Sequence, residues 1–197
     1  YYAIQVMNDV LGGGGFTSRI TNRVRSDEGL AYSARSAFPG GVYYPVVFRA
    51  GFQSKSRTVA YATSIVLEEI ERITREPVTK EELLTTKKSF IDTFPNNFAS
   101  AAQVVSAFAS DEMIGRYAKQ PDYWANYRDN IESVDIAAVQ HVAKQRLKLD
   151  QMIILIVGQK GEILKGHPDH PVKLGRLVKG GVIELPMRDP LTMQPAK

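Results

Sequence analysis

Residues 11–33 read Leu11-Gly-Gly-Gly-Gly-Phe-Thr-Ser-Arg-Ile-Thr-Asn-Arg-Val-Arg-Ser-Asp-Glu-Gly-Leu-Ala-Tyr-Ser33 and contain the change from helix to strand that decides the fold. Phe16, Ile20 and Val24 recur at four-residue spacing, which predicts a short helix after the glycines. Gly29 suits the left-handed residue that follows a helix, and the apolar pattern after it changes to period two. We therefore expect a helix, a glycine-mediated reversal and then a strand.

The rest of the chain shows the same two periodicities. Helical spacing and prolines predict a helix over 2–11, which ends at the glycines, and a helix over 56–76. Further helices are expected after a Thr79/Glu82 capping box, around Val104–Phe108, after Pro121 and over 135–147. Alternation predicts a β-hairpin of Leu30–Phe38 and Tyr43–Phe52 around Pro39-Gly40-Gly41, a buried strand at Met152–Val157 and a short strand at Val182–Leu185. We expect an α+β domain over 1–185, with helices on one face of an antiparallel or mixed sheet, and a Pro-rich tail over 186–197.

Composition excludes several classes of protein. The 197 residues are 44% hydrophobic and 23% charged, which is typical of a globular protein, and the formal net charge is +4. The absence of cysteine excludes disulfide scaffolds, thiol nucleophiles and thiolate metal sites. The longest apolar run, Met152–Val157, is far shorter than the ~20 residues of a membrane helix. Most of the positive charge lies after residue 158 without a basic block, which argues against a nucleic-acid module.

Common catalytic motifs are missing. The histidines are His141, His167 and His170, and none lies in the H-x-x-E-H or H-E-x-x-H patterns that hold zinc. His141 falls outside the apolar stripe of its helix, and the His167-Pro-Asp-His170 segment reads as a turn. The glycine run is not a phosphate-binding loop, because a helix precedes it and no lysine follows it. It is either a turn between helices or backbone that a partner chain can approach closely.

Tyr32 lies seven positions after Arg25, across the helix–strand junction. Arg25 lies in the last helical turn, and Tyr32 lies near the start of the strand, so both side chains can reach the same space. A phenol and a guanidinium offer several hydrogen-bond donors to a carbonyl oxygen, which is the chemistry of oxyanion stabilisation. The pair alone is also compatible with an ordinary structural role.

The segments Leu11–Ile20, Val24-Arg25 and Gly29–Ser33 resemble the insulinase/pitrilysin-like zinc metallopeptidases, in the C-terminal half of the mitochondrial-processing-peptidase-like branch. In that family two α+β halves close around an unfolded peptide. One half holds zinc through H-x-x-E-H and a distant Glu, and the other presents an Arg and a Tyr. The resemblance implies catalytic roles for Arg25 and Tyr32 and substrate contacts for Gly12, Gly13, Gly14, Gly15 and Phe16. It also implies that zinc is held in the complementary half.

The resemblance further implies the partners of the chain. They are a zinc-bearing domain or subunit and a peptide substrate, with neither nucleic acid nor membrane, and this chain alone should be inactive. The family domain begins with strands before its first helix; without them ahead of Tyr1, an unpaired sheet edge could join two copies. Family habit suggests the bacterial periplasm. The alternative is a non-catalytic scaffold or peptide-binding subunit of the same family, as in respiratory complexes.

Overall fold

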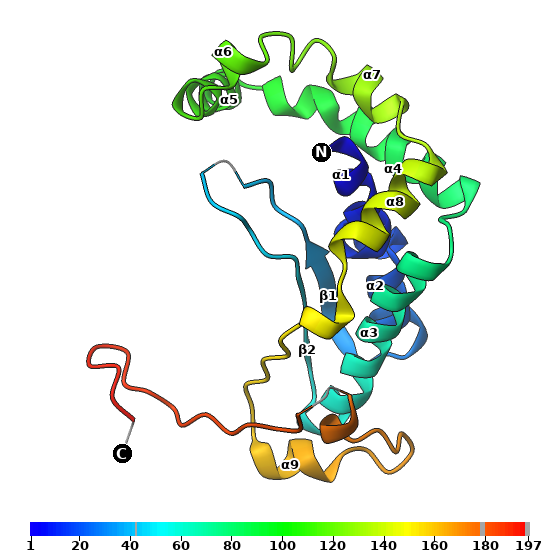
Figure 1. Cartoon of the computed structure of the whole chain (residues 1–197), viewed down its shortest axis with the longest axis vertical. Helices are drawn as coiled ribbons and strands as arrows, with labels where there is room; N and C mark the ends of the chain where they lie inside the picture. Colours follow the sequence, from blue (N-terminus) through cyan, green and yellow to red (C-terminus); the bar gives the residue numbers. More distant parts are fainter. Residues whose placement is uncertain (42, 178–179, 196–197) are drawn as a thin grey trace.

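The computed structural model describes residues 1–41, 43–177 and 180–195 (Figure 1). The α-helices are α1 (Tyr2–Asn8), α2 (Arg19–Thr21), α3 (Val59–Arg75), α4 (Lys80–Thr93), α5 (Ala101–Met113), α6 (Arg116–Lys119), α7 (Tyr127–Glu132), α8 (Ile136–Arg146) and α9 (Lys160–Lys165), and the strands are β1 (Ala31–Ala37) and β2 (Arg49–Ser54). π-Helical turns continue α1 over Asp9–Gly13 and α2 over Asn22–Asp27. Short 3-10 turns lie at Gly15–Thr17, Ser56–Thr58, Phe94–Phe98, Leu149–Gln151 and Leu174–Arg176. None of the described helices combines the length and the apolar character needed to cross a bilayer.

The strands β1 and β2 pair as an antiparallel hairpin, which confirms the predicted reversal between them. The ladder runs from Ala37 opposite Arg49 to Ala31 opposite Ser54. The predicted start of the second strand at Tyr43 is wrong, because β2 begins at Arg49. The stretch before it contains Pro45, which has no N–H to donate to a ladder.

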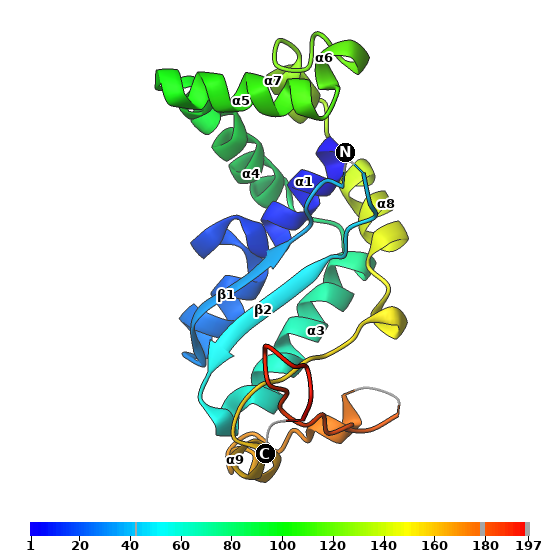
Figure 2. The same cartoon turned by 90° about the vertical axis from the view of Figure 1, so that its left-hand side faces the viewer.

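The helices lie on one face of this hairpin. In Figure 2, α3 runs behind β2 and the helical turns around α2 lie behind β1, whereas the opposite face of the hairpin turns toward the viewer with no helix over it. The inward residues Ala34 and Ser36 are buried, whereas Arg35 and Ala37 between and after them are exposed. The predicted α+β class with helices on one sheet face is confirmed.

The core lies between the inner hairpin face and the helices α1, α3 and α8, together with the helical turns that follow α1 and α2. Its largest fully buried apolar side chains are Val6, Met7, Leu11, Ile20, Val24, Ile65, Ile70, Ile73, Ile131 and Val139. Each of them contributes about 1.5–3 kcal/mol by leaving water. This packing fixes the segment between α1 and β1, which carries the predicted site.

Several predicted helix boundaries are confirmed. The helix α3 ends at Arg75, two residues before Pro77. Thr79 and Glu82 form the predicted capping box at the start of α4. The Asp135 carboxylate accepts the Ala138 N–H at 2.7 Å and caps α8. These boundaries depend on local backbone chemistry, which a sequence specifies directly.

Two helix predictions are wrong. The first helical run does not end at Leu11 before the glycines but continues as a π-helical turn to Gly13, and Gly12 lies so close to β1 that a Cβ there would clash with Ser36. The helix after Pro121 begins only at Tyr127. Residues 121–126 form turns instead, in which Trp124 packs against Phe94, whose ring also stacks on Tyr127. Local spacing predicts neither of these boundaries correctly.

The predicted buried strand Met152–Val157 is wrong. The segment is not a strand, and Ile153 is 94% exposed, with Leu155 and Val157 also exposed. Its other side chains, beginning with Met152, are half-buried, so the alternation is real but one face has no cover. A strand needs a hydrogen-bonding neighbour, and the described residues place none beside this segment.

The predicted strand Val182–Leu185 is also wrong, since these residues are extended, exposed and unpaired in the described part of the chain. Figure 1 shows this C-terminal segment running away from the helices. Residues 196–197 of the predicted tail lie outside the described residues. The boundary between the domain and the tail at residue 185 stays a prediction.

Candidate functional site

Arg25 lies in the π-helical turn Asn22–Asp27, and the backbone after it reverses sharply into β1. Gly29 has φ +60°, a left-handed conformation that glycine adopts without strain. The Gly29 N–H donates to the Arg25 carbonyl at 3.2 Å, and the Leu30 N–H donates to the Val24 carbonyl at 2.9 Å. The predicted role of Gly29 is confirmed, and the reversal brings the start of β1 back beside Arg25.

A β-bulge orients Tyr32. The register shifts between Ala31 and Ala34, so that Tyr32 and Ser33 together face one residue of β2. Ala31 and Ala34 are buried on either side, and the bulge leaves both intervening side chains exposed. Tyr32 is 83% exposed and points away from the core.

Three of the predicted site residues meet at this junction. The Arg25 guanidinium carbon lies 4.7 Å from the centre of the Tyr32 ring and 4.3 Å from the centre of the Phe16 ring. Phe16 is 64% exposed, and Arg25 itself is half-buried. Each cation–π contact contributes about 0.5–1 kcal/mol at an exposed site. The two rings therefore hold the guanidinium in place at the surface and leave its edge free to donate hydrogen bonds.

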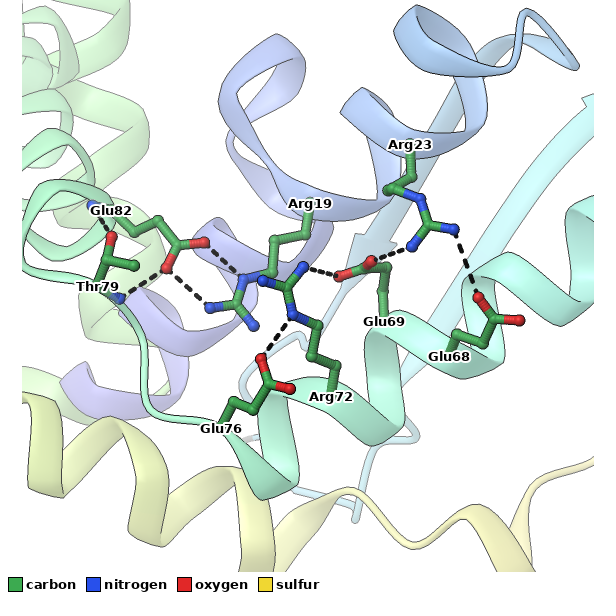
Figure 3. Close-up of polar contacts among 8 residues, drawn as sticks. All are labelled: Arg19, Arg23, Glu68, Glu69, Arg72, Glu76, Thr79 and Glu82. Carbon is green, nitrogen blue, oxygen red and sulfur yellow. Dashed lines mark hydrogen bonds and ion pairs between the residues drawn. The ribbon is translucent and has the colours of Figure 1, made fainter.

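Two partly buried ion pairs fix the helical segment that carries Arg25 (Figure 3). Arg19 Nε and Nη2 donate to the two oxygens of Glu82 at 2.6 and 2.8 Å, and this joins α2 to α4. One turn later Arg23 Nη1 donates to Glu69 Oε1 on α3 at 2.8 Å. Glu69 is fully buried, and its second oxygen lies 3.6 Å from Arg72 Nη1. The backbone leading into Arg25 is thus anchored from two directions.

Glu82 has two functions in this network. Its carboxylate pairs with Arg19, and Oε2 also accepts the Thr79 N–H at 2.8 Å as the second half of the capping box. Burial alone would raise the pKa of Glu82, but the hydrogen bonds from Arg19 and Thr79 outweigh it, so the pKa is lowered. The carboxylate is therefore ionised in the folded protein at neutral pH.

The four glycines Gly12–Gly15 differ in how closely they pack and in how far they are exposed. Gly12 is buried, and a Cβ there would lie 2.6 Å from the Ser36 backbone nitrogen. A Cβ on Gly14 would lie 2.9 Å from the Asp9 carbonyl oxygen. Gly13 and Gly15 are exposed, and Gly15 has φ +62° with open space around it. Only part of the run, together with Phe16, is thus placed to meet another molecule.

The described residues include no group of three or more His, Cys, Asp or Glu side chains arranged to hold a metal ion. His141 is exposed, as predicted. His167 and His170 face each other across a short turn, with ring centres 5.2 Å apart, and His170 also stacks on Tyr61 at 3.9 Å. The donor set of this part of the chain does not fit a resident zinc ion.

Sequence reasoning missed the anchoring residues. Glu82 was identified as a capping residue but not as the partner of Arg19, and Glu69 was not distinguished from other acids of its helix. Arg19 and Arg23 are four residues apart and therefore share one helix face, which was an available signal. The identity of their partners required the packing of α2 on α3 and α4.

The described residues thus form an α+β domain in which the half-buried Arg25 and the exposed Tyr32 lie side by side where the helical segment meets the hairpin. Residues 1–90 match the family model of the Peptidase M16 inactive domain. This part of the chain is therefore similar to the inactive, C-terminal domain of M16 peptidases. No curated protein sequence matches the chain.

Solved structures share this fold. The chain is similar to a peptidase M16 inactive domain from Pseudomonas fluorescens, with a TM-score of 0.64, 22% identity, and coverage of 75% of this chain and 34% of that one. It is also similar to a protease from Helicobacter pylori, with a TM-score of 0.58, 20% identity, and coverage of 75% and 34%. A conserved protein from Enterococcus faecalis gives a TM-score of 0.59, 22% identity, and coverage of 74% and 32%. The chain spans about a third of the length of each of these structures.

Proposed function

We propose that this chain is the substrate-binding and transition-state-stabilising half of a zinc-dependent endopeptidase that acts on extended peptides. The observation that carries the proposal is the cluster of Arg25, Phe16 and Tyr32 on the surface of an M16 inactive-domain segment. In the proposal Arg25 and Tyr32 donate hydrogen bonds to the oxyanion or to an adjacent substrate carbonyl. Phe16 and the exposed glycines Gly13 and Gly15 line the approach of the substrate.

The chemistry of the cluster supports these roles. Within the described residues, neither the Arg25 guanidinium nor the Tyr32 hydroxyl has a hydrogen-bond or ion-pair partner, so their donors are available to another molecule. Donors that are already fixed before charge develops cost little reorganisation in the transition state. Cation–π contacts and the bulge fix these two side chains without using their N–H and O–H groups.

A zinc site is assigned to the complementary half, because the described residues include no group that fits a zinc ion. In the proposal that half holds the zinc ion, whose chemistry is the activation of a water molecule for attack on the scissile carbonyl. The substrate adds as a strand to a sheet edge inside the chamber that the two halves enclose. Membership of the mitochondrial-processing-peptidase-like branch and export to a bacterial periplasm belong to the same proposal.

The test is cleavage of a quenched fluorescent peptide mixture by the protein combined with its zinc-bearing half, with and without a zinc chelator. We expect chelator-sensitive cleavage that the chain does not perform alone. Tyr32→Phe should then lower kcat about 100-fold, the typical effect of removing one oxyanion donor. Tyr44→Phe is the matched control, because Tyr44 is similarly exposed but lies outside β1 and β2.

Full activity of Tyr32→Phe with an unchanged melting temperature would refute the catalytic role. The absence of cleavage in every combination would favour the alternative, in which this fold serves as a scaffold or peptide-binding subunit. Peptide binding that persists without cleavage would identify the chain as a peptide-binding subunit.

A further inference from the structure

The open face of the hairpin carries a pair of arginines. Arg35 on β1 and Arg49 on β2 are exposed, and alternation with the buried Ala34 and Ser36 puts Arg35 on the face opposite the core. No helix covers that face of the hairpin (Figure 2). Arg35 pairs with Gly51 across the ladder and Arg49 pairs with Ala37, so the two arginines are diagonal neighbours. Diagonal neighbours on one face of a sheet lie about 7–8 Å apart. Two like charges are therefore held side by side.

No acidic residue of the hairpin offsets this charge. From 29 to 67 the sequence contains no Asp or Glu, but it contains the four basic residues Arg35, Arg49, Lys55 and Arg57. Arg57 is neutralised by Glu162 from outside this segment, with Nε 2.6 Å from the carboxylate. Neither strand therefore contributes a negative charge to the open face.

The two arginines of this face have no carboxylate partner within the described residues. Six arginines form ion pairs with carboxylates: Arg19, Arg23, Arg57, Arg72, Arg75 and Arg116. Within the described residues Arg25, Arg35 and Arg49 form none, and neither do four arginines elsewhere in the chain: Arg128, Arg146, Arg176 and Arg188. The charge of Arg35 and Arg49 is thus uncompensated and faces solvent beside the proposed site.

The residues opposite the two arginines are small. A Cβ added to Gly51 would meet nothing within 4 Å, and Ala37 is exposed opposite Arg49. An extended chain can therefore approach this face closely without displacing bulky side chains. Alternate side chains of an extended peptide are about 6.6 Å apart, close to the spacing expected for the two guanidinium stems.

We propose that this face selects acidic peptides, with carboxylates at alternate positions paired to Arg35 and Arg49 while the backbone lies toward Arg25 and Tyr32. The inference rests on the proposed function, because it names the substrate class of the same site. A nucleic acid is less favoured, since two or three arginines neutralise too few phosphates for more than weak binding. Arg35 and Arg49 are specificity residues in this scheme and have no part in the chemical step.

The test measures binding to the full chain without its zinc-bearing half, by fluorescence anisotropy at low salt. The probes are three labelled 12-residue peptides that differ only at two alternate positions, which carry Glu, Gln or Lys. Because an exposed ion pair contributes modestly, we expect the Glu peptide to bind about three- to tenfold more tightly than the Gln peptide. The Lys peptide should bind most weakly, and 300 mM NaCl should remove most of the difference.

The variant Arg35→Gln/Arg49→Gln should bind the Glu and Gln peptides equally and should melt like the wild type, because both side chains are exposed. Arg75→Gln is the control, since it removes one exposed positive charge from α3 and should leave the preference intact. Equal binding of the Glu and Gln peptides by the wild type would overturn the proposal. So would a preference that survives the double substitution, or tighter binding of a single-stranded DNA of equal charge.

Failure of this inference is distinguishable from failure of the proposed function. Chelator-sensitive cleavage without an acidic preference would overturn only the specificity of the open face. An acidic preference in binding without any cleavage would support the face and favour the peptide-binding alternative.

Discussion

Replacing Glu82 by Gln tests whether the charge that joins α2 to α4 stabilises the segment leading to Arg25. The glutamine keeps the length of the side chain and can still complete a capping box. It cannot keep the ion pair, because one of its two polar atoms becomes an NH2 group. In the wild type, Glu82 Oε1 accepts from Arg19 Nε, and Oε2 accepts from Arg19 Nη2 and the Thr79 N–H, so the new NH2 would face a donor in either orientation of the amide.

The expected magnitude follows from burial. The Arg19 side chain is only 6% exposed and that of Glu82 is 25% exposed. Removing one partner of a fully buried pair costs about 3–5 kcal/mol, because the other charge is left uncompensated. Since Glu82 keeps partial access to water, we expect a loss of about 2–3 kcal/mol in the free energy of unfolding. For a protein of this size that lowers Tm by about 5–10 °C.

The assay is urea unfolding followed by circular dichroism, with Glu71→Gln as the matched control. Glu71 pairs with Arg75 in α3 at 2.5 Å, but both side chains are exposed. An exposed i,i+4 pair contributes about 0.3–0.5 kcal/mol, so the control should change stability little. A loss in Glu82→Gln no larger than that in Glu71→Gln would refute the reasoning from burial.

The stability difference should also depend on pH. The pKa of Glu82 in the folded protein lies below its ordinary value of 4.5, so its contribution is fully present above that pH. It is lost as the pH falls through the lowered pKa, because the carboxyl then takes up a proton. The gap between wild type and Glu82→Gln should be constant from pH 7 to about 5 and should shrink toward pH 3. A gap that keeps its full size at pH 3 would contradict an ionic origin.

Two further predictions concern close packing and a buried acid. Gly12→Ala places a Cβ against the Ser36 backbone and should destabilise by about 1–3 kcal/mol in urea unfolding, whereas Gly161→Ala, in a helix with open space around it, should be neutral or stabilising. Loss of stability in the second variant but not the first would contradict the contact. Asp111→Asn weakens the buried acceptor that holds the indole N–H of Trp124 at 2.5 Å. It should lower stability by about 1–3 kcal/mol and shift the emission of the single tryptophan, and unchanged emission would argue against this hydrogen bond.

Sequence periodicity predicted the two strands of the hairpin but also predicted a strand that does not form. Alternation and the glycine and proline residues predicted two antiparallel strands, and the chain forms them. The same rule failed at Met152–Val157, because alternation describes which side chains could share a face but not whether a neighbouring strand supplies hydrogen bonds. Composition and spacing cannot supply that neighbour.

The candidate site likewise has one feature that sequence spacing predicted and one that depends on strand register. Sequence spacing predicted that Arg25 and Tyr32 occupy one region, and the reversal at Gly29 brings them together. The bulge that leaves Tyr32 exposed depends on the register between β1 and β2, so no local pattern announced it. The assignment of catalytic roles to these residues stays a proposal.

The sequence by itself determined the α+β class, the hairpin, the helix caps and the proximity of Arg25 to Tyr32, because these depend on residues close together in the chain. The tertiary structure alone decided that Gly12 packs against β1, that Glu69 and Glu82 anchor the arginines of α2 and its π-helical continuation, and that Arg35 and Arg49 share an uncovered face. The physical reason is that ion pairing, burial and strand register depend on distances between residues far apart in sequence. Those distances exist only when the helices have packed on the hairpin.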